Sequence, residues 1–432
     1  MRTGLLALSL CFLPLAATAN SFFKLEGHGG PIKGIAVSSD GQRILTASFD
    51  NSLGLWQGGV PVWLEEHAAA ANTAAFIDDQ TAVSAGDDFA VYLWDLKTFI
   101  PKHLGNHKGK VTSLRVAPDG SRAASASWDG TVVLWSLNGT QNRSIRVDSN
   151  VNDIAFINGG RSLMTASTDG KVRIWDTASG AFQQLFLSNG FGVNTLVVDE
   201  TRGWVAYGAV DGVTRIVDLT TAETLKDVTL DRRPILAMAA SRDGGTIAIG
   251  DGEGYITLLD TSDWSIRADF RATHRGPIWA LAFSADGQNI HAGGLDDAMF
   301  SWPLADPRNA PKMVAKDRPF LNGNDSASNG ERQFQRKCSI CHTLSNDSAR
   351  RAGPTLKGLF GRPAGTVDKY LYSQTLLDSG IVWNAATIDA LFDLGPNVYI
   401  EGTKMPVQLI SSPKDRADLI EYLRHFSNVK EN

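Results

Sequence analysis

Seven copies of one phrase run through residues 22–303 and constrain the fold more than any other feature of the sequence. Each copy has two small residues, an acidic or turn pair, and a β-rich run that ends at an apolar residue, usually Trp. The copies end at residues 56, 94, 135, 175, 217, 259 and 302, which are 38 to 43 positions apart. The acidic residue always stands six positions before the end. A period near 40 with alternating β-formers predicts one four-stranded blade per copy.

The phrase resembles the repeat of the WD-repeat β-propellers, and seven copies imply seven blades over residues 20–303. In that family a His about 22 residues before the turn Asp bonds this Asp and a strand Ser or Thr, and so locks the blade. Four His residues stand 21 or 22 positions before the acid: His28, His67, His107 and His274. The middle copies lack this His, so we expect their blades to be held together mostly by apolar packing. Because weak repeats are easily miscounted, six or eight blades are the alternative.

The segment Phe22–Leu25 precedes the first Gly-His pair of the repeats. A lone four-stranded sheet leaves two apolar faces and two edges exposed, whereas blades stacked around an axis cover these faces. We therefore expect residues 22–25 to supply the outer strand of the last blade and to close the ring.

The first 19 residues have the features of a secretory signal peptide. Arg2 gives a positive start, the run from Leu5 to Ala16 is apolar, and Ala17-Thr18-Ala19 is a cleavage pattern. This run is shorter than the ~20 residues of a typical membrane span, and no later stretch is apolar for long enough. Cys11 follows a Leu rather than a small residue, so a lipoprotein signal is the weaker interpretation. We expect export to the periplasm as a soluble protein with no membrane span.

The composition of the 432-residue chain argues against some classes of partner and of structure. Its net charge of −5 argues against nucleic acid as a main partner. Three Cys residues are too few for a disulfide scaffold, and removal of the signal leaves only Cys338 and Cys341. Residues 304–325 break the repeat period and are rich in Pro and then in small polar residues, which predicts a linker.

A Cys-x-x-Cys-His motif lies at Cys338, Cys341 and His342. This is the attachment pattern of a c-type haem, in which both thiols form thioethers and the His places a nitrogen on the iron. A zinc site would require four N or S ligands, and a redox pair of Cys residues would not need the His. Export agrees with haem attachment, which takes place outside the cytoplasm in bacteria. The motif therefore predicts one covalently bound haem c.

Residues 326–432 resemble a class I cytochrome c of the mitochondrial and alphaproteobacterial type. The resemblance is carried by Gly353–Gly365 after the haem motif, by Gly402–Pro406, and by a C-terminal helix at Asp415–Leu423. The fold class implied for the whole chain is an all-β seven-bladed propeller followed by an all-α cytochrome c domain. In that domain, Gly330 and Phe334 of the first helix are expected to meet Leu419 and Tyr422 of the last helix.

The resemblance also implies a set of haem-contacting residues. The carbonyl of Pro354 is expected to accept a hydrogen bond from the ring of His342, and Met405 is expected to be the second axial ligand, so that His342 and Met405 hold the iron. Four side chains are expected to donate to the haem propionates: Arg362, Tyr372, Ser373 and Trp383. One departure from the family is Leu391, which stands where a Tyr usually bonds the Met sulfur.

Two hypotheses describe the function. In the first, the protein is an electron carrier without catalytic residues, and its propeller docks redox partner proteins; it could still serve as a subunit of an oxidoreductase complex. In the second, it is a multi-cofactor oxidoreductase with a second active site in the propeller, as in nitrite reductases that join a cytochrome c domain to an eight-bladed propeller, although there the domain order is reversed. The Trp, Asp and His residues of the propeller recur with the repeat, which favours a structural role. Only His103 and His291 lie off the repeat, and neither has a paired ligand at metal-binding spacing, which favours the first hypothesis.

The two parts differ in charge. From residue 325 onward there are 13 Lys plus Arg and 12 Asp plus Glu, a net charge of +1. The remaining mature chain has 27 basic and 34 acidic residues, a net charge of −7. The acidic field of the propeller favours a basic partner.

Overall fold

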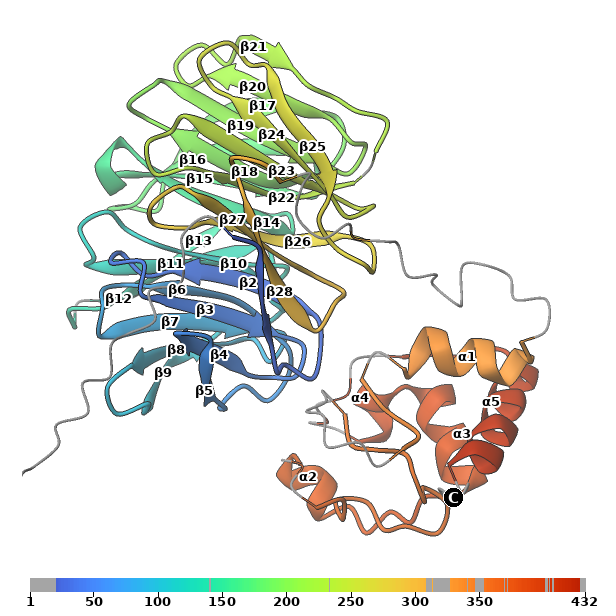
Figure 1. Ribbon diagram of the computed structural model, residues 1–432. Helices are drawn as coiled ribbons and strands as arrows, with labels where there is room; N and C mark the ends of the chain where they lie inside the picture. Colours follow the sequence, from blue (N-terminus) through green and yellow to red (C-terminus); the bar gives the residue numbers. More distant parts are fainter. Residues whose placement is uncertain are drawn as a thin grey trace, which may run out of the picture.

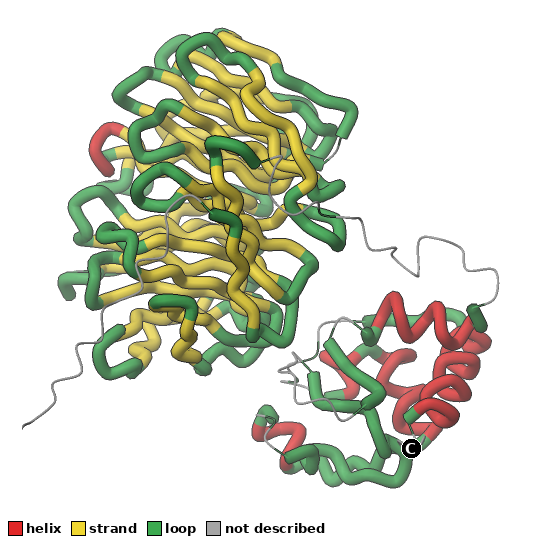
Figure 2. The backbone as a smooth tube through the Cα atoms, viewed as in Figure 1, coloured by secondary structure: helices red, strands yellow, loops and turns green. Residues whose placement is uncertain are grey.

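The computed structural model describes residues 21–307 (except 140 and 233), 313, 327–345 (except 340), 353–400 (except 369 and 371), 403, 405 and 408–427. Strands make up the first part of the chain, and the C-terminal part contains helices joined by loops (Figure 2). The predicted signal peptide at residues 1–19 and most of the predicted linker lie outside the described residues. None of the helices in the described part of the chain has the length and apolar character needed to cross a membrane.

In the described part of the chain, twenty-eight strands form seven antiparallel sheets of four strands each. The first four blades contain β2(Ile32–Val37), β3(Arg43–Ser48), β4(Leu53–Gln57) and β5(Val60–Leu64); β6(Ala71–Phe76), β7(Thr81–Gly86), β8(Ala90–Asp95) and β9(Pro101–Asn106); β10(Val111–Val116), β11(Arg122–Ser127), β12(Thr131–Ser136) and β13(Arg143–Arg146); β14(Val151–Ile157), β15(Ser162–Ser167), β16(Lys171–Asp176) and β17(Phe182–Ser188). The last three contain β18(Val193–Asp199), β19(Trp204–Ala209), β20(Thr214–Asp218) and β21(Thr224–Asp227); β22(Ile235–Ala240), β23(Thr246–Asp251), β24(Tyr255–Asp260) and β25(Ile266–Arg271); β26(Ile278–Phe283), β27(Asn289–Gly294), β28(Ala298–Pro303) and β1(Phe23–Glu26). A short 3-10 helix, η1(Asn158–Gly160), joins β14 to β15.

The N-terminal strand closes the ring. β1 pairs antiparallel with β28 and so forms the outer strand of the seventh blade, as expected for residues 22–25. The first strand of each blade contacts the first strand of the next, and β26 contacts β2, so these seven inner strands form a closed ring. Figure 1 shows the blades side by side. The predictions of seven blades and of ring closure are confirmed.

A chain of side-chain hydrogen bonds locks each of the first three blades. In blade one, His28 Nδ1 bonds the carboxylate of Asp50 at 2.9 Å and its Nε2 bonds Thr46 Oγ1 at 2.7 Å. Trp56 Nε1 donates to the same hydroxyl at 2.7 Å, which ties the final Trp of the phrase to the His. Blades two and three repeat the arrangement with Ser in place of Thr, through His67, Asp88, Ser84 and Trp94, and through His107, Asp129, Ser125 and Trp135. In blade seven the backbone N–H of His274 donates to Asp296.

Blade six has an ionic lock that we did not predict. The guanidinium of Arg232 bonds the buried carboxylate of Asp251 and also that of Asp269. Asp251 accepts from the backbone N–H groups of Glu253 and Tyr255, so it is the turn acid of this blade, whereas the sequence phrase points to Glu253. Blade six therefore adds an ionic lock, in which an Arg occupies the role of the missing His, to the apolar packing expected of the middle blades.

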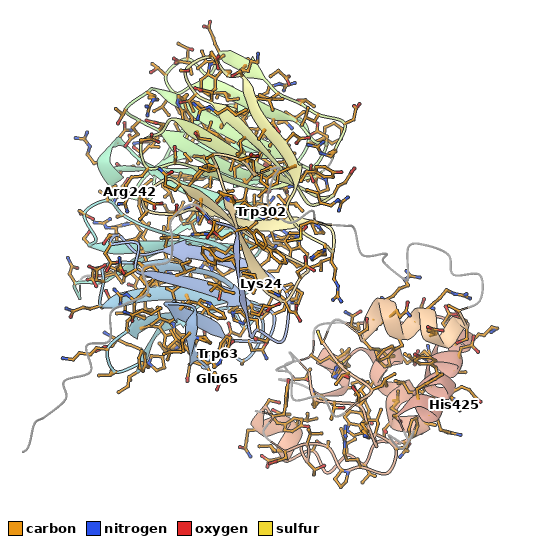
Figure 3. The ribbon with its side chains drawn as sticks, viewed as in Figure 1. Lys24, Trp63, Glu65, Arg242, Trp302 and His425 are labelled. Atoms are coloured by element: carbon orange, nitrogen blue, oxygen red, sulfur yellow. The ribbon has the colours of Figure 1, made fainter. Side chains whose placement is uncertain are left out.

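Apolar side chains fill the space between neighbouring blades. One core cluster joins blades three and four through residues such as Leu134, Ile154 and Trp175, and further clusters of the same kind follow around the ring. Trp302, at the end of the last copy, lies inside the propeller and is 2% exposed (Figure 3). This packing joins each blade to its neighbours around the ring.

The C-terminal part contains α1(Asn329–Lys337), α2(Gln374–Leu377), α3(Ala385–Leu394), α4(Pro396–Tyr399) and α5(Pro413–Phe426). α1 crosses α5 closely at Gly330, where a Cβ atom would lie 2.1 Å from the carbonyl oxygen of Asp418 and 2.7 Å from Cβ of Tyr422. The rings of Phe334 and Tyr422 are 5.5 Å apart, and Leu419 belongs to the same core. The expected crossing of the first and last helices is present.

Candidate haem-binding site

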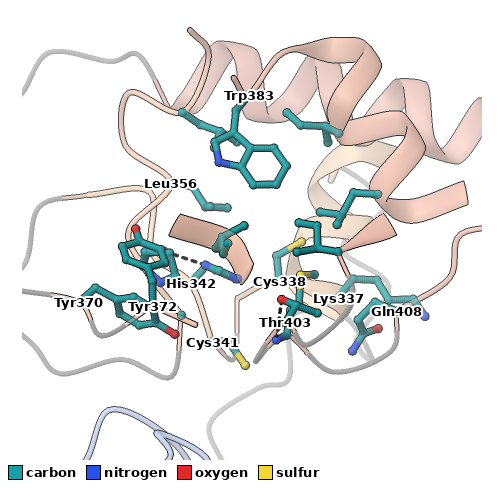
Figure 4. A pocket seen from close by; sticks show the side chains of 18 of the residues that line it. Lys337, Cys338, Cys341, His342, Leu356, Tyr370, Tyr372, Trp383, Thr403 and Gln408 are labelled. Carbon is teal, nitrogen blue, oxygen red and sulfur yellow. Dashed lines mark hydrogen bonds between the residues drawn. The ribbon is translucent and has the colours of Figure 1, made fainter. Parts of the chain in front are cut away.

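A cavity of about 300 Å³ lies mainly within the helical domain, and four propeller residues also line it: Phe49, Asn51, Ala70 and Asp87 (Figure 4). Apolar side chains make up much of its lining, among them Leu356, Leu359, Ile388, Leu391, Phe392 and Leu423. All nine residues predicted from the sequence line this cavity: Cys338, Cys341, His342, Pro354, Arg362, Tyr372, Ser373, Trp383 and Met405. They come from the end of α1, from three loops and from the start of α2, so the fold gathers residues that are up to 67 positions apart.

The turn after α1 presents the two thiols. The backbone N–H groups of Cys341 and His342 both donate to the carbonyl of Cys338, at 3.0 and 2.9 Å, which places the three motif residues on one tight turn. Burial raises the pKa of the Cys338 thiol to about 12 and that of Cys341 to about 11. A reactive Cys pair requires a lowered pKa, so this environment disfavours the alternative of a redox pair.

The ring of His342 is held by one hydrogen bond. Its Nδ1 donates to the carbonyl oxygen of Pro354 at 2.7 Å (Figure 4). Because a carbonyl only accepts, the proton must be on Nδ1, and Nε2 keeps its lone pair for a metal. Burial lowers the pKa of His342, which favours the same neutral form. A Cβ on Gly353 would lie 2.4 Å from Cε1 of the ring, so the close approach of backbone and ring depends on glycine there.

Met405 reaches the same cavity from the loop before α5. Its backbone N–H donates to Thr403 Oγ1 at 3.2 Å. Of the predicted ligand loop Gly402–Pro406, only Thr403 and Met405 belong to the described residues. Leu391 is buried in the cavity wall, so the departure from the family places an apolar side chain there.

The polar side chains of the site differ in whether they already have hydrogen-bond partners. Arg362 donates from both terminal nitrogens to backbone carbonyls, to Lys357 at 2.7 Å and to Thr355 at 2.8 Å. Tyr372 accepts from the backbone N–H of Val367 at 3.3 Å. Ser373 Oγ is buried and has no hydrogen-bond partner in the described structure. An orphaned hydroxyl at the wall of a cavity fits a donor that awaits an anionic group such as a propionate.

Tyr370 is a lining residue that we did not predict from the sequence. Its ring packs edge-on against Tyr372 with centroids 4.7 Å apart, and burial raises its pKa. The alternating Tyr-x-Tyr pattern was the only signal that could have pointed to it.

Comparison with known proteins agrees with this site. The family profile "Cytochrome c" matches residues 327–427, and the profile "WD domain, G-beta repeat" matches residues 20–57, 99–136, 139–176 and 268–302. A cytochrome c of Cannabis sativa is 41% identical over 104 residues, which are 24% of this chain and 89% of that protein. Cytochromes c of Gossypium barbadense and Gibberella zeae are 43% and 40% identical, over 22% of this chain and 85% and 89% of their own lengths.

The class defined by fold and site is thus a seven-bladed WD-repeat propeller joined to a haem-binding helical domain. Through its C-terminal domain the chain belongs to the cytochrome c family. Membership implies a covalently bound haem c and electron transfer. The residues present fit that group, since two thiols, a His with a free Nε2 and a Met thioether converge on one largely apolar cavity that also holds an unpartnered hydroxyl.

Proposed function

We propose that this protein is exported to the periplasm and carries single electrons through one haem c attached at Cys338 and Cys341, with His342 and Met405 as axial ligands. The propeller serves as the docking platform for a redox partner protein. The observation that carries the proposal is the convergence of these four residues on one cavity.

Haem c supplies an iron that cycles between two oxidation states. The residues of this chain set the conditions for that cycle. The Pro354 carbonyl keeps His342 in one tautomer and one orientation, which raises the basicity of the ligand nitrogen. A Met thioether as second ligand leaves no open coordination position and favours a high reduction potential. The apolar wall, with Leu391 and Phe392, limits water near the iron.

A docking role for the propeller is supported by its rigidity and its charge. The ring is closed by β1 and packed between all blades, so its loops have a fixed arrangement. The net charge of −7 outside the cytochrome domain favours a partner with a basic surface. A multi-cofactor oxidoreductase is the competing function, and it requires a second cofactor.

The cofactor content tests the proposal. Full-length protein purified from the periplasm should give one c-type haem per chain in pyridine haemochrome analysis, and acid-acetone should not extract it. A Cys338→Ala, Cys341→Ala double variant should lose covalent haem but keep the propeller. Extractable haem in the wild-type protein, or two haems per chain, would contradict the one-haem carrier and favour the oxidoreductase.

The axial ligand is tested by Met405→Leu, which keeps an apolar side chain of similar size and removes the sulfur. The weak far-red charge-transfer band of a Met-ligated ferric haem should disappear, and the reduction potential should fall because the thioether no longer favours the ferrous state. Met164→Leu in the propeller core is the matched control and should leave both unchanged. A wild-type protein without the band that binds carbon monoxide readily would contradict Met ligation.

A further inference from the structure

The mouth of the propeller channel holds a second cavity. The inner strand of each blade starts where the second strand ends, as in the pairing of Ile32 with Ser48 and of Ile278 with Gly294. The starts of these inner strands and the turns beside them surround a cavity of about 340 Å³. Its lining residues all belong to the propeller, and two of them, Phe49 and Asp87, also line the haem-binding cavity, so the two cavities adjoin.

The second residue of the inner strand is a latch in four consecutive blades. Its side chain donates a hydrogen bond to the carbonyl of the first inner-strand residue in the next blade. The four pairs are Asn72 with Val111 (2.9 Å), Thr112 with Val151 (2.7 Å), Asn152 with Val193 (2.9 Å) and Asn194 with Ile235 (2.8 Å). A polar residue at this position therefore has a structural role that recurs with the repeat.

Three consecutive blades break this pattern. Blades six, seven and one have Leu236, Trp279 and Lys33 at the latch position, and in the described structure none of the three side chains donates to the next blade. Instead, Trp279 stacks on Phe49 with ring centroids 5.5 Å apart, and Lys33 Nζ lies 4.7 Å from the centroid of Trp279. A break confined to one arc of the channel mouth indicates a function for that arc.

The lining of the cavity has a net positive charge: Lys33, Lys110 and Arg115 stand against Asp87 and Asp153, and of these five only Lys33 belongs to the arc. A second ammonium group, Lys110 Nζ, lies 3.3 Å from the ring centroid of Trp128. Among the described residues neither Lys33 nor Lys110 has a hydrogen bond or an ion pair to its ammonium group, and both line the cavity. Burial and the charge of Lys110 lower the pKa of Lys33 to about 8, whereas Asp87 opposes the shift. The carboxylate of Asp87 already accepts from Asn72 at 2.6 Å, so two ammonium groups face one engaged carboxylate.

We propose that the channel mouth binds a carboxylate with an apolar body, the carboxylate against the ammonium groups of Lys33 and Lys110 and the apolar body against Trp279 and Phe49. A partly desolvated ammonium gains a charge-assisted hydrogen bond from such a ligand, and the two aromatic faces bury its apolar part. A free organic acid or a Glu or Asp side chain of a docked protein presents this same chemistry. The site lies wholly in the propeller and does not rest on the proposed electron transfer.

Titration calorimetry of the full-length haem-loaded protein tests the site. The probes are sodium benzoate, its neutral counterpart benzamide, and a capped peptide with one Glu beside a Phe, paired with its Gln version. Benzoate or the Glu peptide should bind one to one at pH 7, and the neutral counterparts should bind at least about tenfold more weakly, as expected for a charge-assisted contact. Binding of benzoate identifies a free acid as a sufficient ligand, and binding of the Glu peptide alone identifies a protein side chain.

Two variants test whether the ammonium group of Lys33 binds the carboxylate or whether any loss of a Lys charge weakens binding. Lys33→Met keeps the length of the side chain and removes the charge, so it should weaken binding of the carboxylate about tenfold or more. The melting temperature should not fall, because the substitution removes a partly buried charge. Lys102→Met, on the exposed strand β9, is the matched control and should bind as the wild type does. The proposal is overturned if no carboxylate probe binds, if the neutral probes bind equally well, or if Lys33→Met binds as the wild type does.

Discussion

At the scale of single residues, one hydrogen bond decides which nitrogen of His342 is available. The bond to the Pro354 carbonyl fixes the tautomer, and Gly353 leaves the room that the ring needs. The conformation of Gly353 is ordinary, so its importance lies in contact rather than in backbone freedom. Any side chain at this position must displace the ring or the backbone.

Replacement of Gly353 by Ala should disturb the haem site specifically. The new Cβ would lie 2.4 Å from the His342 ring, which forces a shift of ring or backbone at a cost of about 1–3 kcal/mol. We expect a weakened or lost low-spin haem spectrum in Gly353→Ala, measured by absorption of the periplasmic protein. Gly358→Ala is the matched control, since no atom lies within 4 Å of its Cβ and its φ of +64° costs only backbone strain of about 1–2 kcal/mol. An unchanged spectrum in Gly353→Ala would contradict this role.

At the scale of elements, apolar packing is common to all the blades, and different polar interactions add to it in different blades. The His-Asp-Ser/Thr-Trp chain locks the first three blades, and the Arg232 pair locks blade six.

The closing blade has an unusual buried group, His291 on β27, which is 3% exposed. Its Nδ1 has no hydrogen-bond partner in the described structure, and its ring lies 5.8 Å from that of Phe23 on β1. This His is therefore packed as an apolar side chain where the ring closes.

His291 makes the stability of the propeller sensitive to acid. Burial lowers its pKa from 6.5 to about 4, and Asp286 only partly opposes this. A His with a lowered folded pKa binds its proton more readily in the unfolded chain, so the free energy of unfolding falls as the pH decreases from about 6.5 to about 4. The loss should be on the order of 1–3 kcal/mol. Denaturant unfolding across this pH range should show a smaller decrease for His291→Phe than for the wild type, and the exposed His103→Phe should behave as the wild type does. Equal slopes for all three proteins would show that His291 is not responsible.

At the scale of the whole molecule, a propeller and a cytochrome c domain are joined by a segment rich in Pro and small polar residues. Each part has its own core: the propeller clusters lie between blades, and the helical cluster contains Phe334, Ile388 and Leu419. Domains with separate cores and a linker of this composition fold independently as a rule.

The separate contributions of the propeller and of the cytochrome c domain can be measured. We expect residues 325–432 alone, expressed with an export signal, to fold, bind haem and change redox state normally. Reduction by the native partner should be slower than in the full chain, because a docked propeller holds the haem near its partner at an effective concentration of roughly millimolar. Stopped-flow reduction of both proteins across ionic strength makes the comparison, with a small-molecule reductant as the control that should act equally on both. Equal rates with the partner at every salt concentration would show that the propeller does not dock it.

The sequence by itself determined the number of blades and the composition of the haem-binding site. The acid-to-Trp spacing and the Cys-x-x-Cys-His motif are local patterns, and local patterns follow from the chain order. The His hydrogen bonds of the first three blades could also be predicted from the sequence, because the spacing of the His residues recurs from copy to copy.

Only the tertiary structure decided which partners complete these patterns. Arg232 stands at the repeat position of the missing His, 21 positions before Glu253, but it bonds Asp251 instead of that residue, and the latch from Asn72 to Val111 joins residues 39 positions apart. In the haem-binding cavity, Arg362 donates to backbone carbonyls while Ser373 keeps an unpartnered hydroxyl. The physical reason is the same in each case. A spacing fixes where a side chain begins, but which of several nearby acceptors it reaches depends on how the neighbouring strand or loop packs against it.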